Sequence, residues 1–190
     1  MRMLSKAKYL LLSRYGSTEM RTKCFDSKYR ECEWSFSQRD EELLSVLSRM
    51  GRRKRALMLG CGQAAIASDL VPAVFDSLTG VDLSVAAVES ARQQHPKTGI
   101  TFEVGNMESW PGEGSYDAII FSESIYYTPF WKRKQMLRHW KEKLSSDGVF
   151  VVTISQPQRY RGILTMIRQG FEVSQDFQSE RGQRWFIIFR

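Results

Sequence analysis

The sequence predicts an α/β fold in which a mostly parallel β-sheet is covered by helices on both faces. Short apolar runs alternate with segments of helical periodicity from residue 56 to residue 168. The runs are apolar almost throughout, as expected for parallel strands that are buried on both faces. The last two runs, residues 171–177 and 184–189, flank an Arg181-Gly182 turn and predict an antiparallel hairpin at one edge of the sheet.

The length and composition are typical of one globular domain. The chain has 190 residues, of which 42% are hydrophobic and 26% charged. We divide it into an N-terminal helical or lid segment, residues 1–50, and a core, residues 51–190. No apolar run approaches the roughly 20 residues that cross a bilayer, and the N-terminus lacks the features of a signal peptide. We therefore expect a cytoplasmic protein without a membrane partner, and its oligomeric state stays open.

The N-terminal segment predicts two helices separated by a loop. The first helix is predicted over residues 6–14, and the loop that follows, residues 15–36, is dense in aromatic side chains. Such a loop either packs on the domain or covers a ligand. A second helix is predicted to begin after Ser37, a good N-cap with Asp40 three residues later, and to end at Gly51.

Strands and helices alternate in the remainder of the chain. Ser84 is an N-cap residue directly before one helical segment, and Pro96 follows the end of that segment. The predicted strands before the hairpin are residues 56–59, 78–81, 100–104, 116–121 and 149–154. The predicted helices are residues 64–70, 84–94, 130–144 and 163–168. Helices between parallel strands should form right-handed crossovers.

The charged residues and cysteines indicate no special chemistry by themselves. The formal net charge is +7, and the one dense basic run, residues 52–55, directly precedes the first strand. We interpret that run as a solvated loop rather than as a nucleic-acid patch. The cysteines, Cys24, Cys32 and Cys61, are odd in number and lack metal-ligand spacing, which argues against a disulfide framework and a metal site.

Candidate ligand-binding residues follow the first four predicted strands. In an open α/β sheet, ligands bind beyond the carboxyl ends of the strands, so the residues directly after each strand are the ones to consider. A glycine turn there lets the backbone approach a ligand, and a helix that starts after it adds free N–H groups. The residues at these positions are Gly60, Cys61, Gly62, Asp82, Leu83, Asn106, Met107, Ser122 and Glu123.

These side chains suit a nucleoside. Asp82 follows Gly60 by about twenty residues, the offset of a carboxylate that accepts hydrogen bonds from ribose hydroxyls. The alternative, that Asp82 caps the next helix, is weaker because Ser84 suits that position better. Leu83 and Met107 are placed to sandwich an adenine ring. Asn106 offers both a donor and an acceptor to the amino edge of that ring.

The motifs at the strand ends resemble those of class I S-adenosylmethionine-dependent methyltransferases. The resemblance covers about residues 56–154. It rests on the segments Leu59-Gly60-Cys61-Gly62, Gly80-Val81-Asp82-Leu83-Ser84 and Gly105-Asn106-Met107, together with residues 116–121 and 144–149. The resemblance implies a Rossmann-like seven-stranded sheet of order 3-2-1-4-5-7-6, which accounts for the terminal hairpin. It also implies S-adenosylmethionine as cofactor and S-adenosylhomocysteine as product, with the Gly60–Gly62 turn cradling the amino-acid end.

Two positions depart from the family pattern. Met58 stands where the family usually has an acidic residue that orients the first loop and the methionine amino group. Ala64 replaces a third glycine, and its small side chain is compatible with that position. Met58 keeps open the alternative of a methyltransferase-like partner subunit that has lost catalysis.

A narrower similarity concerns the acceptor. Residues 122–127 and 33–36 are similar to nodulation-type N-methyltransferases, which act on an amino sugar of a chito-oligosaccharide. The expected acceptor is therefore an amine or hydroxyl of a small molecule or saccharide. Glu123 is the candidate base or ammonium ligand, unless it caps a loop or pairs with a basic residue. The residues expected to line the acceptor pocket, or alternatively to pack helices, are Trp34, Tyr126, Tyr127 and Trp131.

A nucleic-acid methyltransferase is the other enzymatic alternative. The basic balance of the chain supports it. Enzymes that methylate base amino groups usually carry an Asn/Asp-Pro-Pro-aromatic motif after the fourth strand. The segment Ser122-Glu123-Ser124-Ile125 does not match that motif, so a nucleic-acid acceptor is disfavoured.

Overall fold

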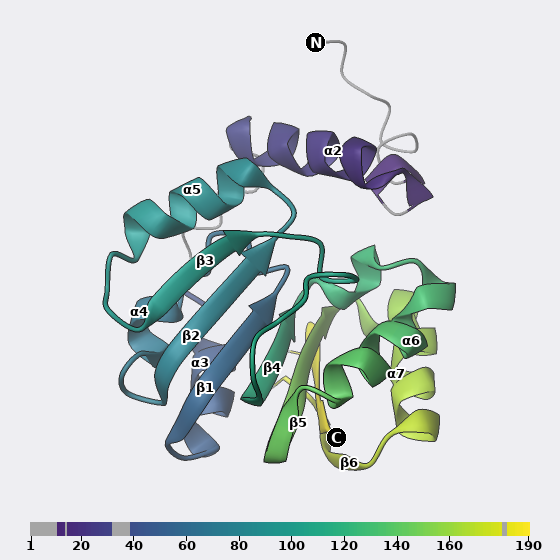
Figure 1. The fold of residues 1–190 in the computed structure, drawn as a ribbon. Coiled ribbons are helices and arrows are strands. Elements are labelled where there is room, and N and C mark those ends of the chain that lie inside the picture. Colours follow the sequence, from purple (N-terminus) through teal and green to yellow (C-terminus); the bar gives the residue numbers. More distant parts are fainter. Residues whose placement is uncertain (1–10, 14, 32–38, 180–181) are drawn as a thin grey trace.

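A computed structural model describes residues 11–13, 15–31, 39–179 and 182–190. Its seven-stranded sheet has the order β3-β2-β1-β4-β5-β7-β6 (Figure 1). All pairings are parallel except those of β7 with β5 and β6. The predicted topology and hairpin are thus confirmed. The strands are β1 (Arg53–Leu59), β2 (Phe75–Asp82), β3 (Ile100–Val104), β4 (Tyr116–Ser122), β5 (Leu144–Ser155), β6 (Val173–Gln178) and β7 (Arg184–Phe189).

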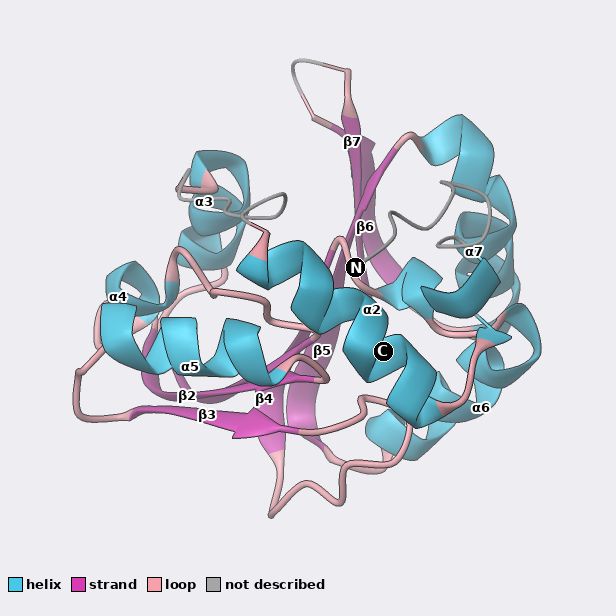
Figure 2. Ribbon diagram, turned by 90° about the horizontal axis from the view of Figure 1, so that it is seen from above, coloured by secondary structure: helices cyan, strands magenta, loops and turns pink. Residues whose placement is uncertain are grey.

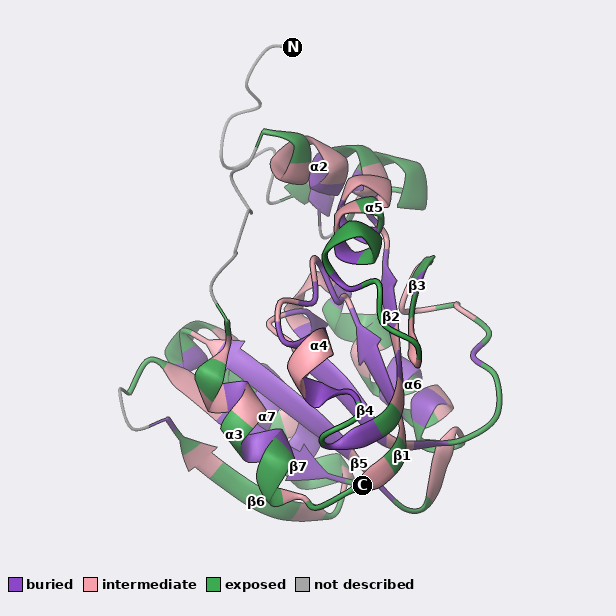
Figure 3. Cartoon of the chain, turned by 90° about the vertical axis from the view of Figure 1, so that its left-hand side faces the viewer, coloured by how far each residue is buried: buried purple, intermediate pink, exposed green. Residues whose placement is uncertain are grey.

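Helices cover both faces of the sheet. The sheet has a hydrophobic core on each face, and alternate residues of β1 point into different cores. Ala56 and Met58 pack in the first core, and Leu57 and Leu59 pack in the second. Side chains of α3 (Glu41–Arg49), α4 (Ala67–Leu70) and α5 (Val85–Gln94) complete the first core. Those of α6 (Phe130–Lys141) and α7 (Pro157–Gly170) complete the second. The strands at the centre of the sheet are therefore buried on both sides (Figure 3).

The predicted loop before residue 37 contains a helix, α2 (Thr18–Arg30), so that expectation was wrong. Ser17 caps it by accepting a hydrogen bond from the Met20 amide at 3.3 Å. The buried face of α2 carries Arg21 and Phe25. Because that face mixes charge with apolar groups, the helical period is hidden from a simple apolar pattern.

Several predicted boundaries also require correction. The helix expected over residues 64–70 is only the short α4, because Ala64 is left-handed with φ of 49° and residues before Ala67 form turns. The glycine turn is therefore not followed directly by a helix N-terminus. Asp40, not Ser37, caps α3, accepting a hydrogen bond from the Leu43 amide at 3.1 Å. Most of the first predicted helix lies outside the described residues, as do Ser37 and Trp34.

Residues 53–55 of the basic run belong to β1, whereas Arg52 lies in an exposed loop before the strand. Arg53 donates to the Asp147 carbonyl at 3.0 Å, and Arg55 donates to the Glu113 carbonyl at 2.9 Å. The carboxylate of Asp117 accepts from the amides of residues 54 and 55, both at 2.9 Å. These arginines therefore tie neighbouring loops to the amino end of the sheet.

The strand β5 begins at Leu144, inside the predicted helix, and includes residues 145–148, which precede the predicted strand. Its register with β4 shifts between Tyr116 and Ala118, where extra residues of β5 bulge out of the ladder. The helices α6 and α7 correspondingly differ in length from the expected ones: α6 ends earlier, and α7 extends in both directions beyond residues 163–168.

In the part of the chain that the structure describes, no helix is long and apolar enough to cross a bilayer. No group of three metal-ligating side chains gathers among those same residues. Cys24 and Cys61 are buried free thiols, and Cys32 lies outside the described residues.

Trp140 links α6 to the loop after β3, and its loss should lower stability. The fully buried indole donates from Nε1 to the Met107 carbonyl at 2.8 Å. Trp140→Phe keeps most of the apolar volume but leaves that carbonyl without its donor, so we expect the free energy of unfolding to fall by about 1–3 kcal/mol. Urea denaturation measures this change. Trp110→Phe is the matched control, because the Trp110 indole donates to Glu103 at an exposed position.

Candidate functional site

Loops from three strands meet at Gly60. This residue is left-handed, with φ of 68°. A Cβ added there would lie 2.5 Å from the Ser124 Cβ and 3.5 Å from the Met107 Cε. Ser124 Oγ also donates to the Leu59 carbonyl at 2.6 Å. The carboxyl ends of β1, β3 and β4 are therefore in contact at a position that admits only glycine.

The carboxyl end of β2 joins the ends of β1, β3 and β4 through Asp82. Its Oδ2 accepts from the Gly62 amide at 2.8 Å and its Oδ1 from the Ser84 amide at 2.9 Å. The residue is 9% exposed. Burial raises the pKa of the Asp82 carboxyl above its ordinary value, and the charge of Asp26 raises it further, whereas the backbone amides lower it. The carboxylate is thus fixed in orientation, and one lone pair on each oxygen stays available.

The remaining predicted cofactor residues lie beside this centre. Asn106 Oδ1 accepts from the Glu108 amide at 3.0 Å, and Asn106 lines a hollow of about 530 Å³ between α2 and α6. Leu83 directly follows Asp82, and Ser122 ends β4. The Cys61 side chain is buried in the first core, and burial raises the pKa of its thiol well above the ordinary value.

The helix α2 lies across the carboxyl ends of the strands, beside α5 (Figures 1 and 2). The Tyr29 hydroxyl is packed on Gly62, 2.5 Å from the position that a Cβ of this residue would take. Asp26 Oδ1 accepts from Ser84 Oγ at 2.6 Å and from the Ala86 amide at 3.2 Å. One end of α2 is therefore bonded to the loops after β1 and β2.

The preceding turns of α2 contact the other two loops. Arg21 pairs with Glu108 at 2.5 Å, with side chains only 5% and 7% exposed, and also donates to the Tyr127 carbonyl at 3.4 Å. The Phe25 ring meets Tyr127 edge-on at 5.3 Å between centroids. The Nε of Arg21 is buried without a hydrogen-bond partner among the described residues. Through these contacts α2 covers the four strand-end loops, which are the loops that follow β1, β2, β3 and β4.

A second polar cluster surrounds Glu123. This residue directly follows β4, and its backbone adopts the left-handed conformation with φ of 53°. Its carboxylate accepts from the Ser155 amide at 2.6 Å, from Thr153 Oγ1 at 3.0 Å and from the Tyr126 hydroxyl at 3.3 Å. Arg184 donates to it from Nε at 3.1 Å. Pairing with a basic residue, one of the alternatives considered from the sequence, is thus present.

Arg184 joins this cluster to the N-terminal segment. It donates to Asp40, the cap of α3, at 2.7 Å. Burial lowers the pKa of the Arg184 guanidinium, but the hydrogen bond and charge of Asp40 and the charge of Glu123 outweigh burial and raise it overall. Asp40, the permanently charged Arg184 and Glu123 therefore form one row at the carboxyl ends of β4 and β5.

The predicted acceptor-site aromatics fall into two groups. Tyr126 stacks on Tyr160 with centroids 4.5 Å apart and contacts Tyr127 at 4.8 Å. Burial raises the pKa of the Tyr126 hydroxyl, and the charge of Glu123 adds to the rise. Trp131 is instead 57% exposed and stacks on Tyr15 at 5.6 Å. Trp131 therefore lies at the surface, whereas Tyr126 is half-buried between Tyr127 and Tyr160.

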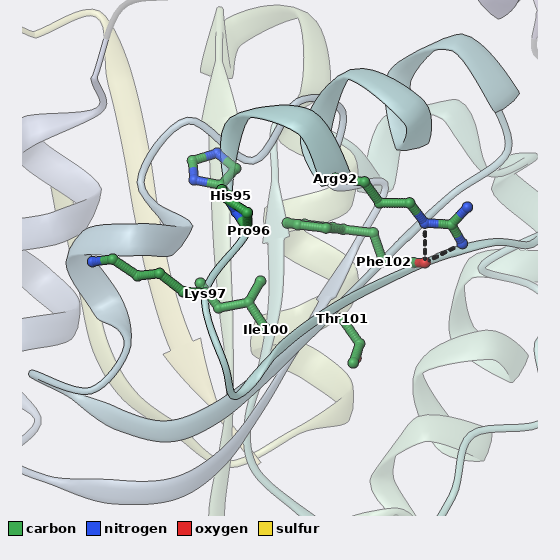
Figure 4. A pocket seen from close by; sticks show the side chains of 7 residues that line it. All are labelled: Arg92, His95, Pro96, Lys97, Ile100, Thr101 and Phe102. Carbon is green, nitrogen blue, oxygen red and sulfur yellow. Dashed lines mark hydrogen bonds between the residues drawn. The ribbon is translucent and has the colours of Figure 1, made fainter.

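Another hollow, of about 330 Å³, lies at the outer edge of the sheet (Figure 4). Arg92 and Lys97 are the basic side chains that line it, and Arg92 donates twice to the Phe102 carbonyl, at 3.1 and 2.6 Å. Burial lowers the pKa of His95, which also lines it. None of the residues predicted from the sequence to bind a ligand lines this hollow.

Several residues of the site were missed by sequence reasoning. Arg21, Phe25 and Tyr29 recur every four residues, a spacing that places them on one helix face and could have revealed the buried side of α2. Arg184 lies far along the chain from Glu123, and no local pattern marks it as a partner. Asp26, the second carboxylate at the start of α5, likewise carries no sequence signal.

Similarity to known proteins covers the region that builds this site. Residues 56–148 match the family described as "Methyltransferase domain". Among solved structures, the N-methyltransferase NodS from Bradyrhizobium japonicum is 19% identical, with 78% of this chain and 92% of that chain aligned at a TM-score of 0.67. A TehB-like S-adenosylmethionine-dependent methyltransferase from Corynebacterium glutamicum is 17% identical, covering 90% and 98%, at a TM-score of 0.69.

Proposed function

We propose that the chain is a class I S-adenosylmethionine-dependent methyltransferase that methylates an amine or hydroxyl of a small molecule or saccharide, because residues 56–148 match a methyltransferase domain and NodS is similar in fold. The observation that supports this most is the meeting of the four strand-end loops under α2, with Asp82 fixed among them. NodS and the glycopeptide N-methyltransferase MtfA, both similar in fold, are N-methyltransferases by name. We therefore place an amine first among the acceptors.

The residues present fit a nucleoside cofactor. Asp82 is buried and fixed by two backbone amides, so its remaining lone pairs can accept both ribose hydroxyls. Leu83 and Met107 would flank the adenine ring, and Asn106, whose Oδ1 accepts from the Glu108 amide, would offer its amide nitrogen to the edge of the ring. The backbone of residues 60–62 would hold the amino-acid end. The two glycines of this turn allow Ser124 and Tyr29 to pack directly on it, since a Cβ at either position would lie 2.5 Å from one of these side chains.

Asp82 also compensates for Met58 in this proposal. Met58 is 3% exposed and packs in the first apolar core, so no acidic side chain reaches the glycine turn from β1. The Gly62 amide bonds instead to Asp82. One carboxylate would therefore orient the turn and bind the ribose.

Methyl transfer requires little from the protein beyond alignment. When bound, S-adenosylmethionine supplies a methyl group on a sulfonium whose departure leaves a neutral thioether. The protein contributes mainly by holding the acceptor in line. Glu123 is held by Ser155, Thr153 and Arg184 at the end of β4, and we propose that its carboxylate attracts an ammonium or accepts its proton. The Tyr126 ring would form a wall of the acceptor pocket.

Calorimetric titration with S-adenosylhomocysteine tests the cofactor assignment. The wild-type protein is expected to bind it with one-to-one stoichiometry. No binding would favour the methyltransferase-like partner subunit that Met58 left open. Incubation with methyl-labelled cofactor and a panel of amino sugars, their N-acetylated forms and RNA then tests the acceptor. Label on RNA alone would overturn the small-molecule proposal.

Cofactor affinity should depend on pH through Asp82. Only the ionised carboxylate can accept both ribose hydroxyl protons, and burial raises the pKa of this group. Affinity is therefore expected to be full above that raised pKa and to be lost as the pH falls through it, at a higher pH than for an ordinary aspartate. Titration across a pH series measures the midpoint. Asp26→Asn removes a nearby negative charge and should shift the midpoint to lower pH; an unchanged midpoint would exclude Asp26 as a cause.

A further inference from the structure

The rim of the site carries exposed apolar side chains that the proposed function does not use. We call Leu11, Tyr15, Phe130 and Trp131 the rim patch. All four are large and at least half exposed, with 59%, 50%, 66% and 57% of their surface accessible. Tyr15 stacks on Trp131, and Phe130 meets Trp131 edge-on at 5.0 Å, so three of the four form one continuous group. Such a patch is unusual on a soluble surface and marks an interaction site.

Leu11 extends the patch along the N-terminal segment. Residues 11–13 and 15 are helical, and Leu11 precedes Tyr15 by one helical turn, which places both on one face. Phe130 and Trp131 start α6, directly after the loop that carries Tyr126 and Tyr127. The start of α6 therefore lies at the end of the sheet where the strand-end loops meet, and residues of α2 and α6 line one hollow there. Figure 2 shows the ribbons of these two helices beside each other.

Basic side chains of α6 follow the rim patch along the helix. Lys134 and Arg138 are exposed and follow Phe130 at successive four-residue intervals on α6. Neither makes an ion pair with the described residues. Exposed aromatic side chains can insert at a membrane interface, and exposed cations near them are attracted to anionic lipids.

We propose that the rim patch and the Lys134–Arg138 stripe dock the protein on an anionic bilayer surface, with its site facing the lipid. Charge complementarity points to an anionic partner. The arrangement of the rings distinguishes a bilayer from single-stranded nucleic acid: bases stack on ring faces, but Tyr15 covers a face of Trp131, and Leu11 offers no ring. Ring edges and an aliphatic side chain are suited to insertion among acyl chains.

This inference differs from the expectation of no membrane partner. That expectation rested on the absence of long apolar runs, whereas surface docking depends on which side chains are exposed. The consequence for the proposed function is that the acceptor could be collected from a lipid surface. The docking itself does not depend on methyl transfer and can fail or succeed separately.

Vesicle sedimentation with the full chain tests the proposal. We expect binding to phosphatidylcholine vesicles that contain phosphatidylglycerol, little binding to phosphatidylcholine alone, and weakening at high salt. Lys134→Gln with Arg138→Gln should reduce the partition coefficient about twentyfold or more, since each basic residue near the surface contributes about fivefold. Phe130→Ser should reduce it about tenfold through lost apolar insertion.

The matched control removes the same charge at the opposite end of the sheet. Arg49 and Lys54 are exposed near the start of β1, and Arg49→Gln with Lys54→Gln should leave partitioning unchanged. Titration with S-adenosylhomocysteine verifies that each variant is folded. Equal binding to neutral vesicles, equal losses in both charge variants, or binding of single-stranded RNA without binding of anionic vesicles would each overturn the proposal.

Discussion

Asp82→Asn should weaken S-adenosylhomocysteine binding about a hundredfold. The carboxylate is proposed to accept two ribose hydroxyls, and hydrogen bonds to a charged group contribute about 1.5–3 kcal/mol each. Asparagine has one oxygen, and its amide nitrogen would face either the Gly62 or the Ser84 amide, both of which are donors. The turn and the ribose site would therefore be lost together. Isothermal calorimetry measures the affinity.

Loss of folding would not explain this result. Because burial raises the pKa of Asp82, folding disfavours its charged form, and a neutral side chain there should not unfold the protein. Asp76→Asn provides the matched control: Asp76 lies near the start of the same strand and pairs with Arg52 at 2.9 Å on the surface. We expect Asp76→Asn to bind like wild type. Unchanged affinity in Asp82→Asn would remove Asp82 from the cofactor site.

Glu123→Gln should reduce turnover by about 10²–10⁴-fold while leaving S-adenosylhomocysteine affinity unchanged. The substitution preserves size but removes the charge proposed to meet the acceptor. It also introduces an amide nitrogen among donors from Ser155, Thr153 and Arg184. Initial rates with labelled cofactor, together with calorimetry on the same variant, separate chemistry from cofactor binding.

Asp40→Asn distinguishes a role in chemistry from a role in holding Arg184. Asp40 is the other carboxylate bonded to Arg184, and asparagine remains a good cap for α3. If Glu123 serves only to pair with Arg184, the two variants should lose similar activity. We expect Asp40→Asn to retain most of its turnover. Full activity in Glu123→Gln would exclude Glu123 from the mechanism.

The strands of the sheet could be predicted well because each strand is marked by the residues within it. Buried parallel strands are short apolar runs, and the strand β3 and the strand β7 were predicted to the residue. The cap of α5 by Ser84 is likewise local and is confirmed, with the hydroxyl accepting from the Ala87 amide at 3.1 Å. The start of α4 was wrong because Ala64 is left-handed, which alanine rarely adopts.

The site was only partly predictable because it depends on pairs that are distant in the chain. Arg184 reaches Glu123 because the antiparallel register of β5 and β7 pairs Arg184 with Ser155, at the end of β5 beside β4. The contact of Arg21 with Glu108 depends on where α2 crosses the sheet. Neither follows from spacing along the sequence. The roles of Asp82 and Glu123 in binding and chemistry stay predictions until the variants are measured.

The position of α2 has a consequence for the rate of turnover. If the cofactor binds beneath α2, its exchange would require the contacts of Tyr29, Asp26 and the buried Arg21–Glu108 pair to separate. Lid opening limits many enzymes in which the chemical step is fast. In such a case exchange of product for fresh cofactor sets the steady-state rate. A rapid-quench experiment would then show a burst of methylated product equal to the enzyme concentration, followed by a slower phase that reports the opening of this helix.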